Sequence, residues 1–431
     1  MFIHPKILDG DGETMSKTKG NGVDPFDVIE KFGADALRFA ICYLTTETQD
    51  VRLPVEFECP SCQAHVKQTR NNRVLPRVKC PKCGRPFSTQ WAETEADQAL
   101  PRAGVVSERF ELARNFCNKL WNASRFALLN LEGYRPGQVT ADELEVEDRW
   151  ILSRLATITD QVTSALDAFR FADAARLLVE FAWDEFCSFY VEMIKARLQD
   201  DNRRTVAQRV LAGALDVLLR LLHPMIPFLT EEVWQRLAEV APERGLDRHP
   251  PATDSVMIAT WPDSRPDRRD AETEQRFSLF QSVLGGVREI RSRQNIPPRT
   301  SLQFSVRCPS EVADQLAPMT AYFQAMAVAT AVAWGPDVEP FVHSGNTSLP
   351  GLEVYVDLED FLDMDAELAR KTKEQVKLDT LIAGKEKKLA NAQFISRAPA
   401  DVVARERDGL AELQRQRTSV ESAIHELRKQ V

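Results

Sequence analysis

The stretch Thr14-Met15-Ser16-Lys17-Thr18-Lys19-Gly20-Asn21 decides how the first part of this 431-residue chain is interpreted. A short apolar segment ends at Leu8, and Asp24-Pro25 is typical of a helix N-cap followed by proline at the first helical position. We therefore expect a loop between a strand and a helix over about 26–43. An ammonium group stabilises charge on a transferring phosphate, and hydroxyl groups can donate hydrogen bonds to it. On these residues alone, a phosphate-handling loop and a solvated surface loop both remain open.

A longer pattern begins with this stretch. It continues with Val23-Asp24-Pro25 and then with Phe32-Gly33-Ala34-Asp35-Ala36-Leu37-Arg38. The whole pattern closely resembles the second signature of class I aminoacyl-tRNA synthetases, most of all that of the valine, isoleucine and leucine group. The resemblance implies a loop that binds ATP, supplied with Mg2+, and that stabilises the transition state of amino-acid adenylation.

The functional positions of that family are carried over one by one. Lys17 matches the central catalytic lysine. The ATP-binding positions implied by the resemblance are Met15, Ser16, Lys17 and Thr18. Two residues depart from the family pattern: Thr18 replaces the usual serine but keeps the hydroxyl, whereas Thr14 replaces the usual lysine and removes one cation.

The composition limits the class of protein. The 55 basic and 64 acidic residues give a formal net charge of -9, which argues against a generally basic nucleic-acid binder but leaves room for local basic tracks. No run of about 18 apolar residues is present, so no membrane span is expected. The first residues lack a signal-peptide pattern, and we expect a cytoplasmic monomer.

Four of the eight cysteines form two CxxC pairs. Cys59 and Cys62 are separated by 17 residues from Cys80 and Cys83, a spacing typical of zinc ribbons. Four thiolates complete a tetrahedral site with no open position, so we expect structural Zn2+ rather than a catalytic metal. Disulfides are the alternative, and they are disfavoured in a cytosolic chain. For the basic residues between the pairs, an RNA contact and a solvated face both remain open.

The chain from about 106 to 240 is strongly helical and predicts a bundle with an aromatic core, because apolar residues recur at helical spacing. A linker rich in Pro, Asp and Arg is expected after it, from 241 to about 270. We expect Thr230 to cap a helix and His223 to have a structural role beside a proline. The composition says no more than this. Three blocks resemble the anticodon-binding domain of the valyl-tRNA synthetase family: Asn118–Phe126, Arg170–Glu192 and His223–Trp234.

A smaller α/β pattern occupies residues 266–356. Alternation from Leu302 to Val306 predicts a strand, and residues 329–332 and 353–356 predict two further strands. Between them, residues 313–327 are expected to form one helix. The segment therefore predicts a small subdomain with a sheet.

The final segment carries two charged helices, over about 359–390 and 400–429, each with a narrow apolar seam. This pattern predicts an antiparallel coiled coil. By composition, an oligomerisation hairpin and an RNA-contacting arm are both open. The pattern from Asn391 to Glu406 resembles the C-terminal arm of valyl-tRNA synthetases, which implies a contact with tRNA.

Together these parts predict a mainly α fold. The predicted domains are the end of a class I nucleotide-binding α/β domain over 1–50, a zinc-ribbon insert over 51–105, a helical anticodon-binding domain over 106–265, a small α/β subdomain over 266–356 and a coiled-coil arm over 357–431. No first signature of the form His-x-Gly-His is found. The resemblance therefore implies that the amino-acid pocket lies upstream, and that this chain is inactive alone.

The function expected from the resemblance is that of a valine-tRNA ligase, of which this chain is a C-terminal part. Its partners would be tRNA(Val), valine and ATP and, if the gene is split, a separately encoded N-terminal catalytic half. A non-catalytic tRNA-binding protein or subunit acting in trans is the alternative. A third possibility is a metal-stapled helical scaffold without an RNA role.

Overall fold

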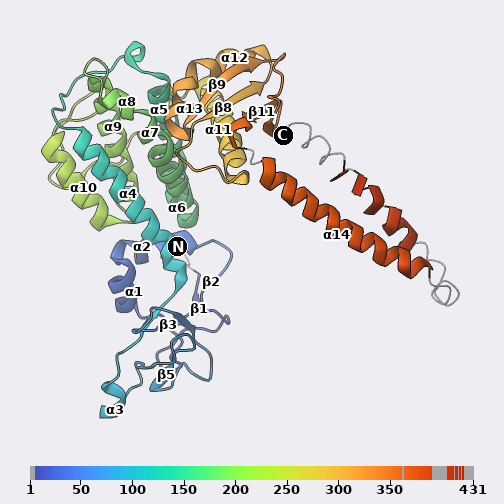
Figure 1. Cartoon of the computed structure of the whole chain (residues 1–431). Coiled ribbons are helices and arrows are strands. Elements are labelled where there is room, and N and C mark those ends of the chain that lie inside the picture. The colour runs from blue at the N-terminus through green and yellow to red at the C-terminus, as the bar shows by residue number, and fades with distance from the viewer. Residues whose placement is uncertain are drawn as a thin grey trace. The chain divides into compact units, whose positions relative to one another are not determined.

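The computed structural model describes residues 5–361, 364–390, 405–411, 413–415, 417–418 and 420–421 (Figure 1). The chain divides into two compact units, Met1–Gln281 and Ser282–Val431. Small sheets and many helices make the fold mainly α. Within the described residues, no helix combines the length and the apolar character that crossing a membrane requires.

The first unit begins with a short parallel pair of strands. β1 (Ile7–Asp9) pairs with β2 (Val51–Leu53), and the connection between them contains α1 (Pro25–Phe32) and α2 (Ala34–Leu44). The prediction of a single helix over 26–43 is wrong. Gly33 separates α1 from α2 with φ +94° and ψ 153°, a backbone conformation that glycine adopts without steric cost.

A group of short antiparallel strands follows β2. β3 (Glu56–Glu58) lies between β4 (His65–Lys67) and β7 (Gly104–Val106). A separate hairpin pairs β5 (Arg77–Lys79) with β6 (Pro86–Ser88). Each strand has three residues, so the ladders alone supply few hydrogen bonds.

We call residues 56–106 the ribbon segment; it also contains the short helix α3 (Glu95–Gln98). The rings of Phe57 and Phe87 meet with centroids 5.8 Å apart. The buried core around them consists of Val55, Phe57, Cys59, Val66, Val78, Cys80, Phe87, Ala103 and Val105. A core of this size buries little apolar surface, and small domains of this kind usually need a metal or a disulfide to be stable.

The rest of the first unit is a helical bundle. Its longer helices are α4 (Glu111–Asn130), α5 (Val146–Asp167), α6 (Phe171–Val179), α9 (Arg204–Leu222) and α10 (Pro227–Val240). α6 continues into η3 (Glu180–Tyr190), and two short helices, α7 (Val191–Met193) and α8 (Lys195–Leu198), follow. Fully buried aromatic side chains fill the core, as the helical spacing predicts. The start of α11 (Ala271–Arg293) joins this core, where Phe277 stacks on Trp150 with ring centroids 4.4 Å apart.

The helix η3 is a π-helix, in which the backbone N–H of Val191 donates to the carbonyl of Phe186, five residues earlier. Its buried aromatic residues are spaced accordingly. Phe181 and Phe186 are five residues apart and Tyr190 follows after four, and all three are fully buried. The widened turn therefore keeps on one face residues that an α-helix would rotate apart.

The start of α10 is capped by a side chain from a distant helix. The carboxylate of Asp35 in α2 accepts from the backbone N–H groups of Phe228, at 3.2 Å, and of Leu229, at 2.6 Å. These N–H groups have no intrahelical acceptor, because they lie in the first turn. Pro227 occupies the first helical position and has no N–H to satisfy.

The prediction that Thr230 caps this helix is therefore wrong. Thr230 lies inside the first turn, where its hydroxyl donates to the carbonyl of Ile226 at 2.8 Å. His223 also contacts Thr230, because its Nδ1 lies 2.8 Å from the Thr230 hydroxyl oxygen.

An ion cluster lies within the bundle. Arg197 is 2% exposed, and its Nη1 lies 2.8 Å from Glu147 and 2.7 Å from Asp148, which are both fully buried. The hydroxyl of Tyr190 also lies 3.4 Å from Asp148. Burial raises the pKa of Asp148 to about 6, although Arg197 acts to lower it. Buried carboxylates of this kind depend on their counter-charge.

The second unit contains a four-stranded sheet in the order β10-β11-β8-β9. Its strands are β8 (Leu302–Arg307), β9 (Ala329–Gly335), β10 (Ser344–Leu349) and β11 (Leu352–Asp357). β8 and β9 are parallel and the other pairs are antiparallel. The sequence did not predict β10, whose small and polar residues lack an apolar alternation.

Two helices, α12 (Ser310–Leu316) and α13 (Thr320–Ala327), stand where one helix over 313–327 was expected. Pro318 lies in the short 3-10 turn between them. Proline removes an N–H donor and clashes with the preceding turn, so it interrupts a continuous helix.

A long helix, α14 (Met364–Ala390), begins the last segment, and the described residues between 405 and 421 are also helical. Leu378 packs with Val420, Arg417 pairs with Asp379 at 2.7 Å, and Lys385 pairs with Glu406 at 2.6 Å. Partners later in α14 meet residues earlier in the second segment, so the two run antiparallel. The predicted connection over 391–399 lies outside the described residues.

Glu406 should titrate well below an ordinary glutamate. Hydrogen bonds from Lys385 and Lys388, each at 2.6 Å, lower the pKa of its carboxyl to about 2. The two ion pairs are therefore retained above the ordinary glutamate pKa, and they are lost as the pH falls through about 2. Carboxyl-detected NMR titration of the intact chain tests this, and Lys385→Met should move the midpoint upward. An ordinary midpoint for Glu406 would contradict these pairs.

Candidate functional site

The predicted loop is closed by an internal clamp. We call Thr14–Asn21 the signature loop. Asn21 is 2% exposed, and its side-chain amide donates to Asp9 at 2.7 Å and to the carbonyl of Thr14 at 3.3 Å. Its amide oxygen accepts from the backbone N–H of Ser16 at 3.0 Å. One buried side chain therefore joins both ends of the loop to the end of β1.

Asp9 is the acceptor at the base of this clamp. Its other carboxylate oxygen accepts from the backbone N–H groups of Glu13, at 2.8 Å, and Asp11, at 3.1 Å. Burial acts to raise the pKa of Asp9. The hydrogen bond from Asn21, those from the backbone and the charge of Arg73 outweigh burial, so the pKa lies below its ordinary value. Asp9 is therefore ionised at neutral pH, and its carboxylate fixes the loop.

Ser16 to Gly20 form a tight turn at the tip of the signature loop. The backbone N–H of Gly20 donates to the carbonyls of Ser16 and Lys17, at 3.2 and 3.1 Å. The side chains of Ser16, Lys17 and Thr18 are exposed, whereas Met15 is half-buried. Among the residues that the structure describes, none forms an ion pair with Lys17. The structure thus presents one ammonium group and two hydroxyl groups from an anchored turn.

The ribbon segment contacts this loop. Met15 and Val23 pack against its apolar core. α1, which begins four residues after the loop, is held to the ribbon segment by Asp27. The carboxylate of Asp27 accepts from the backbone N–H of Val105 at 2.7 Å and from Arg102 at 2.8 Å. The loop and the ribbon segment therefore share one packed region.

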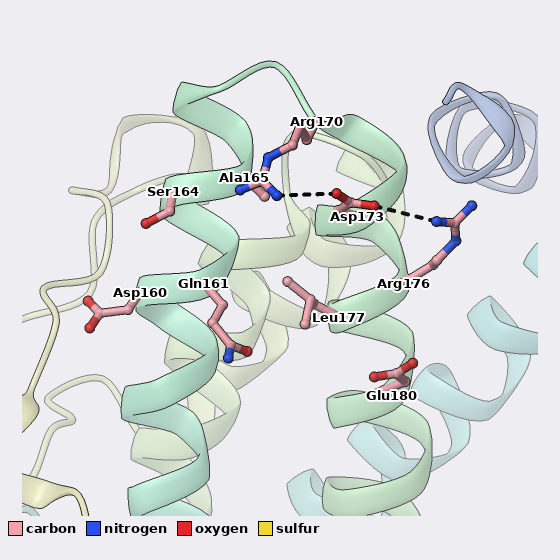
Figure 2. A pocket seen from close by; sticks show the side chains of 9 residues that line it. All are labelled: Asp160, Gln161, Ser164, Ala165, Arg170, Asp173, Arg176, Leu177 and Glu180. Carbon is pink, nitrogen blue, oxygen red and sulfur yellow. Dashed lines mark hydrogen bonds and ion pairs between the residues drawn. The ribbon is translucent and has the colours of Figure 1, made fainter. Parts of the chain in front are cut away.

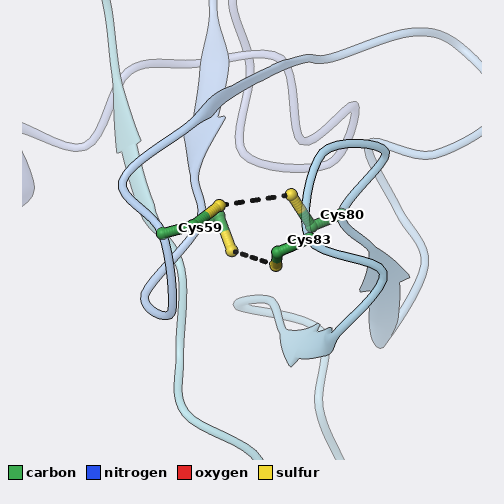
Figure 3. Close-up of side chains that lie close together, drawn as sticks. Cys59, Cys80 and Cys83 are labelled. Atoms are coloured by element: carbon green, nitrogen blue, oxygen red, sulfur yellow. Dashed lines mark hydrogen bonds between the residues drawn. The ribbon is translucent and has the colours of Figure 1, made fainter.

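The four predicted metal ligands lie together. The Sγ atoms of Cys59 and Cys83 are 3.7 Å apart, as are those of Cys62 and Cys80, and all four lie within 4.8 Å of one another (Figure 3). A tetrahedral zinc with bonds of about 2.3 Å places its sulfur ligands about 3.8 Å apart. A disulfide needs about 2.05 Å between the sulfur atoms. The cluster therefore fits a tetrahedral metal and excludes disulfides in this arrangement.

The backbone around the second CxxC pair favours a thiolate. Hydrogen bonds from the backbone N–H groups, first of Cys83 and then of Lys82, lower the pKa of Cys80 to about 7. The thiolate is the form that binds metal. In the same cluster, a backbone hydrogen bond acts to lower the pKa of Cys62, but burial and hydrogen bonds with the neighbouring thiols outweigh it and raise this pKa to about 12.

A second group of possible ligands is already satisfied without a metal. His65 Nδ1 lies 3.0 Å from carboxylate oxygens of both Glu56 and Glu108. On the other side of the ring, Nε2 lies 2.9 Å from the ammonium of Lys31, which also pairs with Glu58 at 3.0 Å. Both imidazole nitrogens therefore have partners, and the group joins α1 to the ribbon segment.

An open cavity of about 490 Å³ lies between α5 and α6 (Figure 2). Its two guanidinium groups, Arg170 and Arg176, both pair with Asp173 at 3.4 Å. Asp160 and Glu180 also line it, and Asp160 pairs with Arg269, so carboxylates match the cations of the cavity. This balance does not favour binding of a phosphate group there.

Sequence reasoning missed the residues that hold the loop. The clamp formed by Asn21 was not predicted, although a polar residue after Gly20 is a usable signal for a turn. Arg73 lies 3.8 Å from Asp9, and the indole of Trp91 lies against Gly20. Neither contact has a signal in the sequence, because both arise only through folding of the ribbon segment.

Three family profiles match the chain. Residues 1–54 match "tRNA synthetases class I (I, L, M and V)", residues 148–306 match "Anticodon-binding domain of tRNA ligase", and residues 363–428 match "Valyl tRNA synthetase tRNA binding arm". The order of these three matches along the chain is the order of the resemblances found in the sequence.

Relatives match over almost the whole chain. A valine–tRNA ligase of Rhodopirellula baltica is 54% identical, and the match covers 99% of this chain and 41% of the relative. Valine–tRNA ligases of Carboxydothermus hydrogenoformans and Geobacter sulfurreducens are 34% and 33% identical, with 99% and 100% of this chain and 42% of each relative covered. This chain thus spans about two fifths of the length of these relatives. The chain belongs to the valyl-tRNA synthetase family and corresponds to the C-terminal portion of its members.

Proposed function

We propose that this chain is the C-terminal part of a valine-tRNA ligase, which joins valine to tRNA(Val) at the expense of ATP. The observation that carries the proposal is the match to such ligases over 99% of the chain at 54% identity. The predicted domain boundaries and a cytoplasmic location are part of the proposal.

In this proposal Lys17 stabilises the phosphates of ATP while valyl-adenylate forms. Its ammonium is exposed on a turn whose base is fixed by Asn21 and Asp9, so little conformational freedom is lost when phosphate binds. The Ser16 hydroxyl oxygen accepts from the backbone N–H of Lys19 at 3.2 Å, which leaves its own proton available to a phosphate oxygen. Thr18 can donate in the same way, Met15 anchors the turn, and Mg2+ accompanies ATP as part of the substrate.

We also propose structural Zn2+ on Cys59, Cys62, Cys80 and Cys83. Their 3.7 Å sulfur separations support it, and the small core of the ribbon segment explains the need for it. Zinc bound by four thiolates has no open position, so it would cross-link the ribbon segment rather than act on substrate.

The remaining parts of the proposal concern tRNA. The helical domain would bind the anticodon side and the antiparallel helical arm another part of the same tRNA, with the chain acting as a monomer. Lys385 and Lys388 are paired with Glu406, so other basic residues of the arm would meet phosphate. Binding should rest mainly on phosphate contacts and weaken with salt.

Changing Lys17 to alanine tests the catalytic part. In the enzyme formed by joining this chain to the remainder of a valine-tRNA ligase, Lys17→Ala should slow valine-dependent ATP–pyrophosphate exchange by about 10²–10³-fold, because one donor to the transition state is lost. Binding of tRNA(Val), measured by filter retention at several salt concentrations, should hardly change.

Lys19→Ala is the matched control, because Lys19 lies on the same turn but pairs with Glu13 at 3.6 Å. Its effect on exchange should be much smaller. Equal losses in the two variants would show that the loop has a different role. No exchange by the joined enzyme, with tRNA(Val) still bound, would favour a non-catalytic tRNA-binding protein instead.

A further inference from the structure

We infer that the ribbon segment clamps the signature loop, and that Trp91 and Arg73 are positioning residues for Lys17. The kinetic part of this inference rests on the proposed function, whereas its structural part does not. Residues of the ribbon segment contact the residues just before the loop, Met15 within it and Gly20 near its end, whereas the turn that carries Lys17 is exposed.

The end of the loop meets Trp91. Gly20 is buried with φ +64°, and a Cβ built on it would lie 2.9 Å from Trp91 Nε1 and 3.1 Å from the carbonyl oxygen of Arg73. Any side chain at this position would therefore collide with the ribbon segment. The indole nitrogen is itself buried, and no hydrogen-bond partner for it is found within the described residues. Trp91 thus contacts the loop by packing rather than by a hydrogen bond.

The residues just before the loop meet two arginines that lie between β4 and β5. Arg70 pairs with Glu13 at 2.5 Å, and Arg73 pairs with the same carboxylate at 3.5 Å. Arg73 also lies 3.8 Å from Asp9, at the base of the internal clamp. Its side chain is 15% exposed, so these interactions are only partly screened by water.

Two levels of restraint follow. Asn21 and Asp9 set the shape of the turn through hydrogen bonds within residues 9–21, and the ribbon segment adds only the charge of Arg73 beside Asp9. Trp91, Arg73 and the packing of Met15 set where the turn lies. Loss of the ribbon contacts should therefore leave the turn formed but free to move, which would displace the Lys17 ammonium from the phosphates.

Trp91→Ala tests the clamp by hydrogen exchange on this chain itself. The reporting amides are those of Ser16 and Gly20, which are bonded within the loop. Their exchange should become roughly tenfold faster in Trp91→Ala, because the loop opens more often, and should stay near the original rate in Trp91→Phe, which keeps an aromatic ring. Unchanged exchange in a folded Trp91→Ala chain would overturn the inference.

A double-mutant cycle between Gly20 and Trp91 gives a second, independent test of the clamp. Gly20→Ala should strongly accelerate exchange in the loop, because the new methyl group collides with Trp91 and the φ of +64° is costly for alanine. In the Trp91→Ala background the added effect of Gly20→Ala should be smaller, since one of its two close contacts is gone. Simple additivity would show that Trp91 does not hold Gly20.

Kinetics of the joined enzyme separate positioning from general stability. Trp91→Ala and Arg73→Ala should raise KM for ATP and lower kcat in valine-dependent exchange, whereas KM for tRNA(Val) should not change. Arg73→Lys should recover part of the loss, because it restores the charge. Lys17→Ala could leave ATP–pyrophosphate exchange unchanged while hydrogen exchange in the loop still responds to Trp91→Ala. That result would refute the proposed function but support the clamp.

Discussion

Replacing Cys80 with serine is expected to release the bound zinc and to unfold the ribbon segment while the helical bundle stays folded. Cys80 is 1% exposed at the centre of the small core, and its sulfur lies 3.7 Å from that of Cys62. Zinc binding in small domains contributes on the order of 10–16 kcal/mol of folding free energy at neutral pH. The strands of the ribbon segment have three residues each, so their hydrogen bonds cannot supply a free energy comparable to that of zinc binding.

Two measurements check this expectation. Atomic emission should find one zinc per original chain and much less in Cys80→Ser. Hydrogen exchange should show lost protection over 56–106 and retained protection in α5 and α9. Cys42→Ser is the control, because Cys42 is a half-buried thiol of α2 outside the cluster. Absence of stoichiometric zinc from the original chain would refute the metal assignment, and zinc retained by Cys80→Ser would refute this ligand.

Arg197→Ala should destabilise the helical bundle by roughly 3–5 kcal/mol, because it leaves buried carboxylates without their counter-charge. The guanidinium lies within 2.8 Å of Glu147 and 2.7 Å of Asp148, and both acids are fully buried. Arg203→Ala is a matched control. Arg203 pairs with Glu145 nearby, but its side chain is 47% exposed, so its loss should cost less than about 1 kcal/mol.

The pH dependence of Arg197→Ala gives a second readout. Burial already raises the pKa of Asp148 to about 6 from its ordinary 3.8, and loss of Arg197 should raise it further. The folded variant then binds a proton that the unfolded chain releases, so its stability should increase as the pH falls from 7 toward 5. Urea unfolding followed by circular dichroism measures both effects. A loss that is independent of pH and equal to that of Arg203→Ala would contradict the cluster's role.

Local patterns in the sequence predicted much of the fold. The CxxC pairs needed only tight turns to bring two sulfurs together, and folding of short strands brought the pairs within reach. Helical periodicity located the bundle, because each helix buries one face. Asp24-Pro25 correctly marked the start of α1, since capping there is local: the Asp24 carboxylate accepts from the backbone N–H of Phe26 at 2.9 Å.

Non-local contacts explain what the sequence did not reveal. Thr230 has the residue type of an N-cap, but Asp35 from a distant helix satisfies the N–H groups of α10 instead. The contact of Trp91 with Gly20 follows from the folded ribbon segment and has no signature of its own. The break at Gly33 was open to prediction from the residue type, but the apolar pattern on both sides suggested one helix. Metal binding and the role of Lys17 stay predictions until they are measured.

The π-helix η3 makes this part of the bundle sensitive to backbone geometry. It ends at Tyr190, only seven residues before Arg197, and its widened turn holds one residue more than an α-helical turn does. Relaxation of these eleven residues to α geometry at unchanged length would rotate everything after them, because each α-helical residue advances about 100° and each π-helical residue less. Arg197 would then turn away from Asp148, so loss of the widened turn would act as if it removed a buried charge. Variation in this segment is thus constrained by its backbone geometry as well as by the identity of its residues.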